Sequence, residues 1–188
     1  AIMSYTNGTD VLHCGGTEES SQGNGAVMRI APLYVIDDKK AVFVSRLTHN
    51  NPVCDETSLL FLHILRELCS GDKKKAYIEM IKYAKKCETP QLKRMADVEF
   101  VKLDVSEIEG KAHAPITLEA AAWSLFTTNS YKECVLRAVN LGRDTDTVGA
   151  VAGALAGALY GINDTNGIPS YWIDKIRDKE TIDAICRL

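Results

Sequence analysis

Apolar residues recur at helical spacing in the middle of the chain. Residues 57–70 are rich in Leu and Ile and are followed by Gly71, a residue typical of helix ends. After Asp72, which can cap a helix, a second apolar stripe consists of Ala76, Tyr77, Met80, Ile81 and Ala84. The pattern therefore predicts two consecutive helices separated by a short turn at Gly71 and Asp72.

Further helices are predicted in the second half. Residues 117–127 combine Ala, Leu and Trp, which favour or tolerate a helix. Ser130 and Glu133 have the spacing of a capping box, for a helix that runs to Leu141 and ends at Gly142. Another helix is expected to begin near Asp146. Residues 88–113 have no clear period and are expected to contain a long connection.

The first fifty residues are less regular. Residues 1–26 are rich in Gly, Asn, Ser and Thr and read as loop. Residues 41–44, with the sequence AVFV, favour a short strand by propensity, and residues 50–52 (NNP) indicate a break. The pattern therefore predicts about six helices and at most one strand. The predicted fold class is all-α, with a single domain over residues 1–188.

The last core helix carries a stripe of glycines. Gly149, Gly153, Gly157 and Gly161 follow one another at intervals of four residues. Each glycine inside a helix costs ~1 kcal/mol relative to alanine, a cost that close helix packing can offset. We therefore expect a central buried helix whose glycine face lies against another helix. The apolar stretch is shorter than the ~20 residues of a membrane-spanning helix, so no membrane partner is predicted.

The amino-acid composition limits the kinds of partner that the chain is expected to bind. The chain has 22 Lys and Arg against 25 Asp and Glu, a net charge of -3, which leaves no basic surplus for a nucleic-acid backbone. The six cysteines have irregular spacing and form no C-x-x-C pair. They indicate free thiols in a reducing compartment. With no signal-like segment at its start, the chain is predicted to be cytoplasmic and to bind no nucleic acid.

The strongest chemical feature is the turn at residues 142–147. It offers the carboxylates of Asp144 and Asp146 and the hydroxyls of Thr145 and Thr147. These hard oxygens suit Mg²⁺, Mn²⁺ or Ca²⁺, and the spacing excludes an EF-hand. Helix capping is the alternative, because Asp and Thr favour helix starts. One cap needs one side chain, however, and this turn supplies four.

A second feature is the sequence SSQGNGAVMR at residues 20–29. Gly23 and Gly25 flank Asn24, and glycines allow backbone N–H groups to approach an anion at the start of a helix. An ordinary glycine turn is the alternative. His49 lies near the break at residues 50–52, and a lone histidine near a turn is more often structural than catalytic. The other histidines, His13, His63 and His113, have no supporting context, and His63 is expected to be packed.

Taken in this order, the segments resemble the ADP-ribosylglycohydrolase family. The resemblance is carried by residues 23–32, 48–52 and 138–147, by the glycine-striped helix, and by the IPxxW sequence at 168–172. It spans roughly residues 20–172. It implies a compact orthogonal helical bundle with a binuclear Mg²⁺ site, Mn²⁺ being the alternative metal, at the base of an ADP-ribose cleft.

The resemblance also implies roles for individual residues. It makes Asp144, Asp146 and Thr147 metal ligands, with Asp146 touching both ions. Arg29 is expected to form a structural ion pair. Residues expected to line the diphosphate or the distal ribose are Ser21, Gly23, Asn24, Gly25 and His49. The implied activity is hydrolysis of the bond between ADP-ribose and a protein side chain or small acceptor, so the expected partner is ADP-ribose or an ADP-ribosylated protein.

Two departures from the family pattern stand out. Arg143 replaces the second glycine of the usual Gly-Gly-Asp sequence. In addition, nothing before Ser20 matches the family's acidic catalytic residue or its Thr-Asp-Asp metal cluster. We therefore expect the catalytic acid to lie upstream of this chain, which would be an N-terminally truncated domain. The alternative is a non-catalytic ADP-ribose-binding or structural homologue that has lost part of the site.

Overall fold

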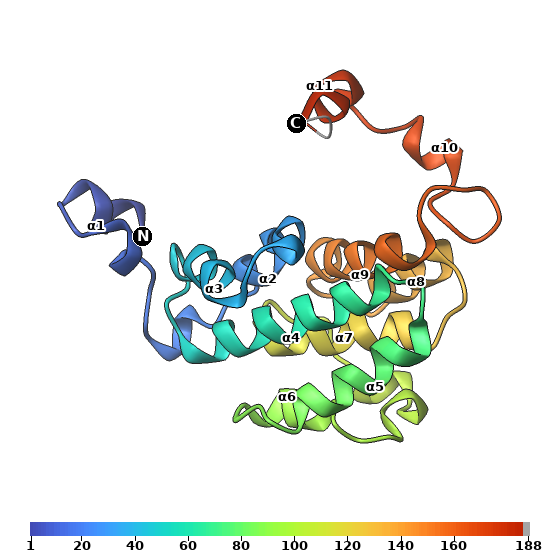
Figure 1. Ribbon diagram of the computed structural model, residues 1–188, viewed down its shortest axis with the longest axis horizontal. Helices are drawn as coiled ribbons and strands as arrows, with labels where there is room; N and C mark the ends of the chain where they lie inside the picture. The colour runs from blue at the N-terminus through green and yellow to red at the C-terminus, as the bar shows by residue number, and fades with distance from the viewer. Residues whose placement is uncertain (186–188) are drawn as a thin grey trace.

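The computed structural model describes residues 1–185 and is built from helices (Figure 1). No strand forms in this part of the chain, which holds only two isolated bridges. The prediction of an all-α fold is therefore confirmed. The α-helices are α1 (Ile2–Thr6), α2 (Gly25–Arg29), α3 (Asp38–Arg46), α4 (Pro52–Leu68), α5 (Lys73–Ala84), α6 (Pro90–Arg94), α7 (Ala114–Phe126), α8 (Tyr131–Val139), α9 (Thr145–Tyr160), α10 (Ser170–Ile173) and α11 (Lys179–Ile185).

Short 3-10 helices join these elements. They are η1 (Val11–His13), η2 (Glu19–Ser21), η3 (Ala31–Val35), η4 (Phe100–Lys102) and η5 (Val105–Glu107). Between α5 and α7, the expected long connection is divided into α6, η4 and η5, of which α6 and η4 pack beside α7.

Helices α4 and α7 form the middle of the bundle (Figure 1). Helix α4 begins at Pro52, earlier than predicted, because Asn51 caps it by accepting a hydrogen bond from the Val53 N–H at 3.0 Å. The NNP sequence is thus a helix start, with proline at the first helical position, where no N–H is needed. Helix α7 is buried from Ala114 to Leu125 except at Ile116, so it crosses the core.

The glycine face of α9 lies against α8, as predicted. A Cβ atom placed on Gly149 would lie 2.9 Å from Val139 Cγ1, and one on Gly153 would lie 3.2 Å from the Tyr131 hydroxyl. At Gly157 the corresponding distance to the Tyr131 ring is an ordinary 3.8 Å. The stripe therefore makes room for α8 at its first two positions, and much less so at the third.

The predicted strand at residues 41–44 is wrong, because these residues belong to α3. Asp37 caps this helix by accepting a hydrogen bond from the Lys40 N–H at 3.0 Å. Ala41 and Ser45, which lie four residues apart, are buried, whereas Phe43 is exposed. Burial at helical spacing outweighs the β propensity of Val and Phe.

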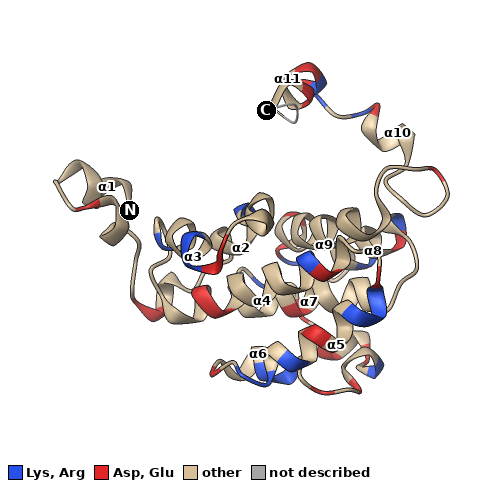
Figure 2. Cartoon of the chain, in the orientation of Figure 1, with Lys and Arg blue, Asp and Glu red and all other residues tan. Residues whose placement is uncertain are grey.

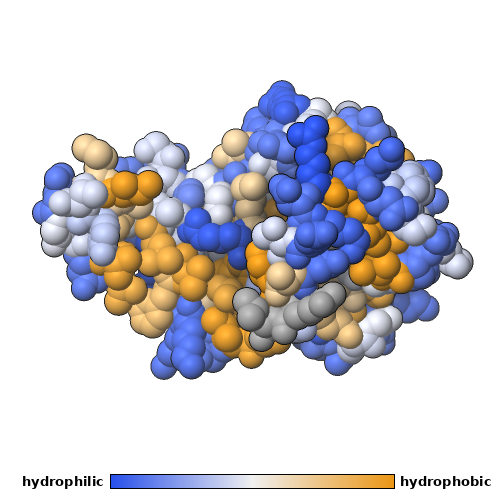
Figure 3. Space-filling view, turned by 90° about the horizontal axis from the view of Figure 1, so that it is seen from above, coloured by the Kyte–Doolittle hydropathy of each residue, from blue (hydrophilic) through white to orange (hydrophobic). Residues whose placement is uncertain are grey.

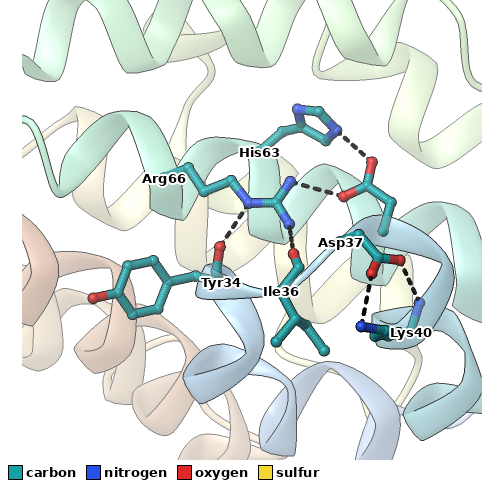
Figure 4. A network of polar contacts seen from close by, with 7 residues as sticks. Tyr34, Ile36, Asp37, Lys40, His63 and Arg66 are labelled. Atoms are coloured by element: carbon teal, nitrogen blue, oxygen red, sulfur yellow. Dashed lines mark hydrogen bonds and ion pairs between the residues drawn. The ribbon is translucent and has the colours of Figure 1, made fainter.

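The start of α3 is tied to α4 by Arg66 (Figure 4). Its guanidinium donates to the Tyr34 carbonyl at 2.8 Å and to the Ile36 carbonyl at 2.9 Å. It also pairs with Asp38 at 2.7 Å, and Asp38 in turn contacts His63 Nε2 at 3.2 Å. His63 stacks on Tyr83, as the prediction of a packed ring required.

The two ends of the chain project from the bundle (Figure 1). Neither α1 nor α11 has a buried residue. A view from above shows apolar side chains on the exposed surface (Figure 3). The large apolar residues that are exposed include Ile2, Met3, Tyr5, Val11, Leu12 and Phe43. Charges of both signs are interspersed over the helices (Figure 2).

Two sequence predictions concern features of the whole chain. Cys14, Cys54, Cys69, Cys87 and Cys134 are free thiols, and Cys186 lies outside the described residues. Within residues 1–185, no helix combines the length and the apolar character needed to cross a bilayer.

Candidate functional site

The glycine loop and the acidic turn meet directly. Asn24 stands just before α2 and Asp144 just before α9. The Asn24 side-chain amide donates a hydrogen bond from Nδ2 to Asp144 Oδ2 at 2.6 Å. Thr147 donates from Oγ1 to Asp144 Oδ1 at 3.1 Å. The structure therefore brings together two motifs that the sequence analysis assigned to one site.

The first turns of α7 and the loop before it hold this contact in place. Asn24 Nδ2 also donates to Thr117 Oγ1 at 2.9 Å, and the Thr117 hydroxyl donates to the Lys111 carbonyl at 2.9 Å. The backbone N–H of Asp144 donates to the carbonyl of Gly110 at 3.0 Å. One loop, residues 110–111, therefore anchors both partners of the Asn24–Asp144 contact.

Gln22 joins the glycine loop to the start of α7. Its carbonyl accepts from the Ala114 N–H at 2.9 Å, and its Oε1 lies 3.0 Å from His113 Nε2. Burial lowers the pKa of His113, with a smaller contribution from the charge of Lys111. The ring is therefore neutral near pH 7 and donates from Nε2. Gln22, His113 and Thr117 were not predicted from the sequence as site residues, although a polar Thr in a largely apolar helix signals a buried hydrogen-bond partner.

His49 lies over the two glycines of the loop. Its Nε2 would be 3.1 Å from a Cβ atom on Gly23, and its Cε1 would be 2.9 Å from one on Gly25. Neither glycine has a positive φ, so the loop needs them for space rather than for backbone conformation. A Cβ atom at either position would crowd the imidazole ring, so the two glycines make room for His49 in its present position.

The protonation of His49 follows from its neighbours. Burial lowers its pKa, and the positive charge of Arg29 lowers it further. Thr48 Oγ1 receives a hydrogen bond from Arg29 and lies 2.7 Å from His49 Nδ1. In the tautomer whose Nδ1 accepts the Thr48 proton, the imidazole proton is on Nε2, the nitrogen beside Gly23.

Arg29 does not form the predicted ion pair within residues 1–185. Its guanidinium instead donates to the carbonyls of Val44 and Ser45, each at 3.2 Å. Those carbonyls belong to the last turn of α3, the negative end of the helix dipole, where a cation is stabilising. The structural role stands, but its partner is a helix end rather than a carboxylate.

Ser21 and Cys54 lie at the base of the loop. The Ser21 side chain packs directly against Gly16, where no Cβ atom could fit. The Cys54 thiol donates to the carbonyls of Ser21 and Gly23 at 3.6 and 3.7 Å. Burial raises the pKa of Cys54 to about 11, so the thiol stays protonated and supports the loop from below.

The acidic turn does not serve as an ordinary helix cap. Asp144 occupies the N-cap position of α9, yet its side chain accepts no capping hydrogen bond. Its two oxygens are taken by Asn24 and Thr147 instead. Asp146 is exposed, and its carboxylate has no hydrogen-bond partner in the described part of the chain. The capping alternative is therefore not supported at Asp144.

The donors of this turn suit a hard divalent cation, but they are few. Asp144, Asp146 and Thr147 offer carboxylate and hydroxyl oxygens of the kind that Mg²⁺ prefers. Across residues 1–185, however, no group of three or more His, Cys, Asp or Glu side chains is placed to hold a metal. Two carboxylates and one hydroxyl are too few for the octahedral shell of Mg²⁺, which water or further oxygens would have to complete.

Arg143 adopts a backbone conformation that favours glycine. Its φ is 61°, and the preceding Gly142 has a φ of 79°. Its guanidinium lies 3.8 Å from the Glu109 carboxylate, with both side chains well exposed. The departure from the family's Gly-Gly-Asp sequence is thus accommodated with backbone strain.

The chain is similar to proteins of one family. The sequence profile described as ADP-ribosylglycohydrolase matches residues 1–188. An ADP-ribosylarginine hydrolase Tri1 of Serratia proteamaculans is 31% identical over 89% of this chain and 46% of that protein. The ADP-ribosyl-[dinitrogen reductase] glycohydrolase of Rhodospirillum rubrum is 29% identical over 84% of this chain and 52% of that protein.

A solved structure extends the likeness to the fold. A chain of an ADP-ribosylglycohydrolase-related protein complex superposes with a TM-score of 0.77 and 33% identity, over 89% of this chain and 59% of that one. The chain spans about half the length of these curated relatives. The matching profile, the relatives and the fold agree, and the chain belongs to the ADP-ribosylglycohydrolase family.

Proposed function

We propose that this chain is part of a hydrolase that cleaves the glycosidic bond between ADP-ribose and a modified protein side chain. Arginine is the proposed acceptor, because two relatives are named ADP-ribosylarginine hydrolases. The observation that carries the proposal is the contact between Asn24 and Asp144 at 2.6 Å. It joins a loop suited to a diphosphate to a turn suited to a cation.

The loop offers several groups to the ADP-ribose. Gly23 and Gly25 are half-buried beside His49, and Ser21 directly precedes this loop at the end of η2. The neutral His49 ring presents an N–H at Nε2, which would donate to a diphosphate oxygen or a ribose hydroxyl. Loop and ring together would bind and orient the nucleotide.

The acidic turn would hold a divalent cation, Mg²⁺ or alternatively Mn²⁺, through Asp144, Asp146 and Thr147. When bound, such an ion supplies positive charge that orients ribose hydroxyls and a water near the anomeric carbon. Asn24 fixes the orientation of the Asp144 carboxylate by a hydrogen bond. The Thr147 hydroxyl donates its proton to Asp144, so the lone pairs of Thr147 Oγ1 would be free for the cation. We assign no general acid among the described residues.

Calorimetric titration with ADP-ribose tests the binding half of the proposal. We expect ADP-ribose to bind in the presence of Mg²⁺ and to bind at least about tenfold more weakly in EDTA. Asp146→Asn should cause a similar loss, because Asp146 is exposed and its carboxylate makes no hydrogen bond that the fold needs. Asp174→Asn, at another exposed aspartate, is the matched control. No binding to the unmodified chain would refute the proposal.

Release of ADP-ribose from an arginine-modified protein tests the catalytic half. Hydrolysis that depends on Mg²⁺ and on Asp146 would support it. The second candidate is a non-catalytic ADP-ribose-binding homologue, which is favoured by the small number of metal-capable side chains in residues 1–185. Tight binding of ADP-ribose without any release, at saturating Mg²⁺ and also in a longer chain that carries the family's N-terminal acidic residue, would support that candidate instead.

A further inference from the structure

Thr117 is a polar side chain in an almost entirely apolar setting. It is fully buried in α7, between the buried residues Pro115, Leu118 and Glu119. Burying a hydroxyl without partners costs free energy, so both of its hydrogen-bonding roles should be used. They are used: its proton goes to the Lys111 carbonyl, and its oxygen accepts from Asn24.

This arrangement fixes the orientation of the Asn24 amide. The only hydroxyl proton of Thr117 is committed to Lys111 at 2.9 Å, so the Asn24 atom facing Thr117 must be a donor. The same atom lies 2.6 Å from a carboxylate oxygen of Asp144, which also requires a donor. Both contacts are satisfied by the two protons of Nδ2, and the reversed amide would satisfy neither.

The amide is therefore left with one free group. Asn24 is 8% exposed, and no side chain or backbone group in residues 1–185 donates to its Oδ1. This oxygen is not among the buried atoms that lack a partner, so it reaches solvent. An amide oxygen accepts hydrogen bonds and cannot donate one to a phosphate.

We propose that Thr117 is a positioning residue of the site, which holds both Asn24 amide protons inward and turns Oδ1 outward as an acceptor. The inference rests on the proposed function for its ligand, ADP-ribose. The group that donates a hydrogen bond to Asn24 Oδ1 would be a ribose hydroxyl or a water molecule, because the diphosphate has no proton to donate. Thr117 would act on binding entirely through Asn24, without touching the ligand.

The first test observes the amide itself and needs no activity. The resonances of the Asn24 side-chain NH₂ can be assigned in ¹⁵N spectra by their loss in Asn24→Ala. In Thr117→Val, which keeps the shape but removes the hydroxyl, hydrogen exchange of this NH₂ should accelerate roughly fivefold to tenfold, as expected for one lost hydrogen bond. Thr117→Ser should restore the exchange rate of the unmodified chain.

Thr57→Val is the matched control. Thr57 is also fully buried, and its hydroxyl donates to the Val53 carbonyl at 2.7 Å within α4, with no link to Asn24. This variant should lose a comparable hydrogen bond and leave the Asn24 NH₂ exchange unchanged. A similar acceleration in both valine variants would show a general loss of stability and would overturn the proposal.

The second test measures ADP-ribose affinity by calorimetry. Thr117→Val should weaken binding about tenfold, and Thr117→Ser less than threefold. In an Asn24→Ala background, Thr117→Val should cause little further loss, because Thr117 acts through the missing amide. Additive losses would overturn the proposal.

The two tests separate the two proposals. If the unmodified chain fails to bind ADP-ribose, the proposed function fails, while the exchange of the Asn24 NH₂ still decides the role of Thr117. Unchanged exchange in Thr117→Val would refute that role whether or not ADP-ribose binds.

Discussion

Asn24 Nδ2 donates to Asp144 Oδ2 across 2.6 Å, although 120 residues separate the two along the chain. The contact pairs a neutral donor with a carboxylate, which makes it stronger than a bond between two neutral groups. The contact also determines how substitutions of Asn24 or Asp144 should change the stability of the chain.

Asn24→Asp should therefore destabilise the chain in a pH-dependent way. Two carboxylates would face each other, at a cost of about 2 kcal/mol or more near pH 7. Their repulsion raises the folded-state pKa of one above its unfolded value, so the deficit should shrink as the pH falls from 7 towards 4. Urea unfolding at both pH values measures this. Asn140→Asp, at an amide whose Nδ2 donates to the exposed Leu136 carbonyl, is the control. An equal deficit at both pH values would contradict the prediction.

Substitutions of the glycines along α9 should change the stability of the chain according to the space at each position. Gly157→Ala is expected to stabilise by about 0.5–1 kcal/mol, because its Cβ would meet Tyr131 at an ordinary 3.8 Å. Gly149→Ala should destabilise, since Val139 Cγ1 lies 2.9 Å away. Gly153→Leu, beside the Tyr131 hydroxyl, should cost ~1–3 kcal/mol through overpacking. Thermal unfolding of the three variants would refute the packing argument if Gly149→Ala were the most stable.

Arg143→Gly should stabilise the chain by about 1 kcal/mol. The change relieves a residue held at a φ of 61°, and the exposed ion pair with Glu109 that it removes contributes little. Arg143→Ala removes the same ion pair without relieving the backbone, so it should not stabilise. Chemical denaturation of both variants distinguishes strain from charge, and equal stability of the two would exclude strain.

Glu119 should make stability fall as the pH rises. Burial raises its pKa to about 7 from 4.5, although the nearby positive charge of Arg94, at 3.4 Å, opposes the shift. The folded state then binds more protons than the unfolded state between pH 4.5 and 7. Its contribution to stability is therefore full below pH 4.5 and lost as the pH rises through 7.

Glu119→Gln should remove this part of the pH dependence, on the order of 2 kcal/mol between pH 5 and 8. His49 and His113 act in the opposite direction, because their lowered pKa values make stability fall below about pH 6.5. They are unchanged in the variant, so the difference between the two proteins isolates Glu119. Glu180→Gln, at an exposed position of α11, is the control. Parallel pH profiles for the original chain and Glu119→Gln would rule out the assigned cause.

The helical spacing of apolar residues predicted most helices of the bundle. The predictions that were wrong have local causes. Helices α4 and α7 begin earlier than predicted because Pro52 and Pro115 stand in their first turns, where proline is tolerated. Residues 41–44 have strand-forming side chains, but the spacing of Ala41 and Ser45 places both in the core from a helix. The strand propensity of four residues does not show which of their side chains other helices will bury.

The site was predictable only where its residues form compact motifs. Asn24 and Asp144 each lie in a short, chemically distinctive sequence, so both were identified. Thr117 was not, because its partners are a backbone carbonyl and an amide that only the tertiary fold brings near. The strain at Arg143 was likewise invisible, since sequence gives a residue type and no φ value.

The two hydrogen bonds that Asn24 donates to Thr117 and Asp144 also bear on the order of folding. They join segments separated by 93 and 120 residues, so they close long loops and raise the contact order of the chain. Both bonds can form only after α2, α7 and α9 have docked. A partly folded chain, however helical, would lack the proposed ADP-ribose site, and a nucleotide bound at that site would shift the folding equilibrium towards the native state.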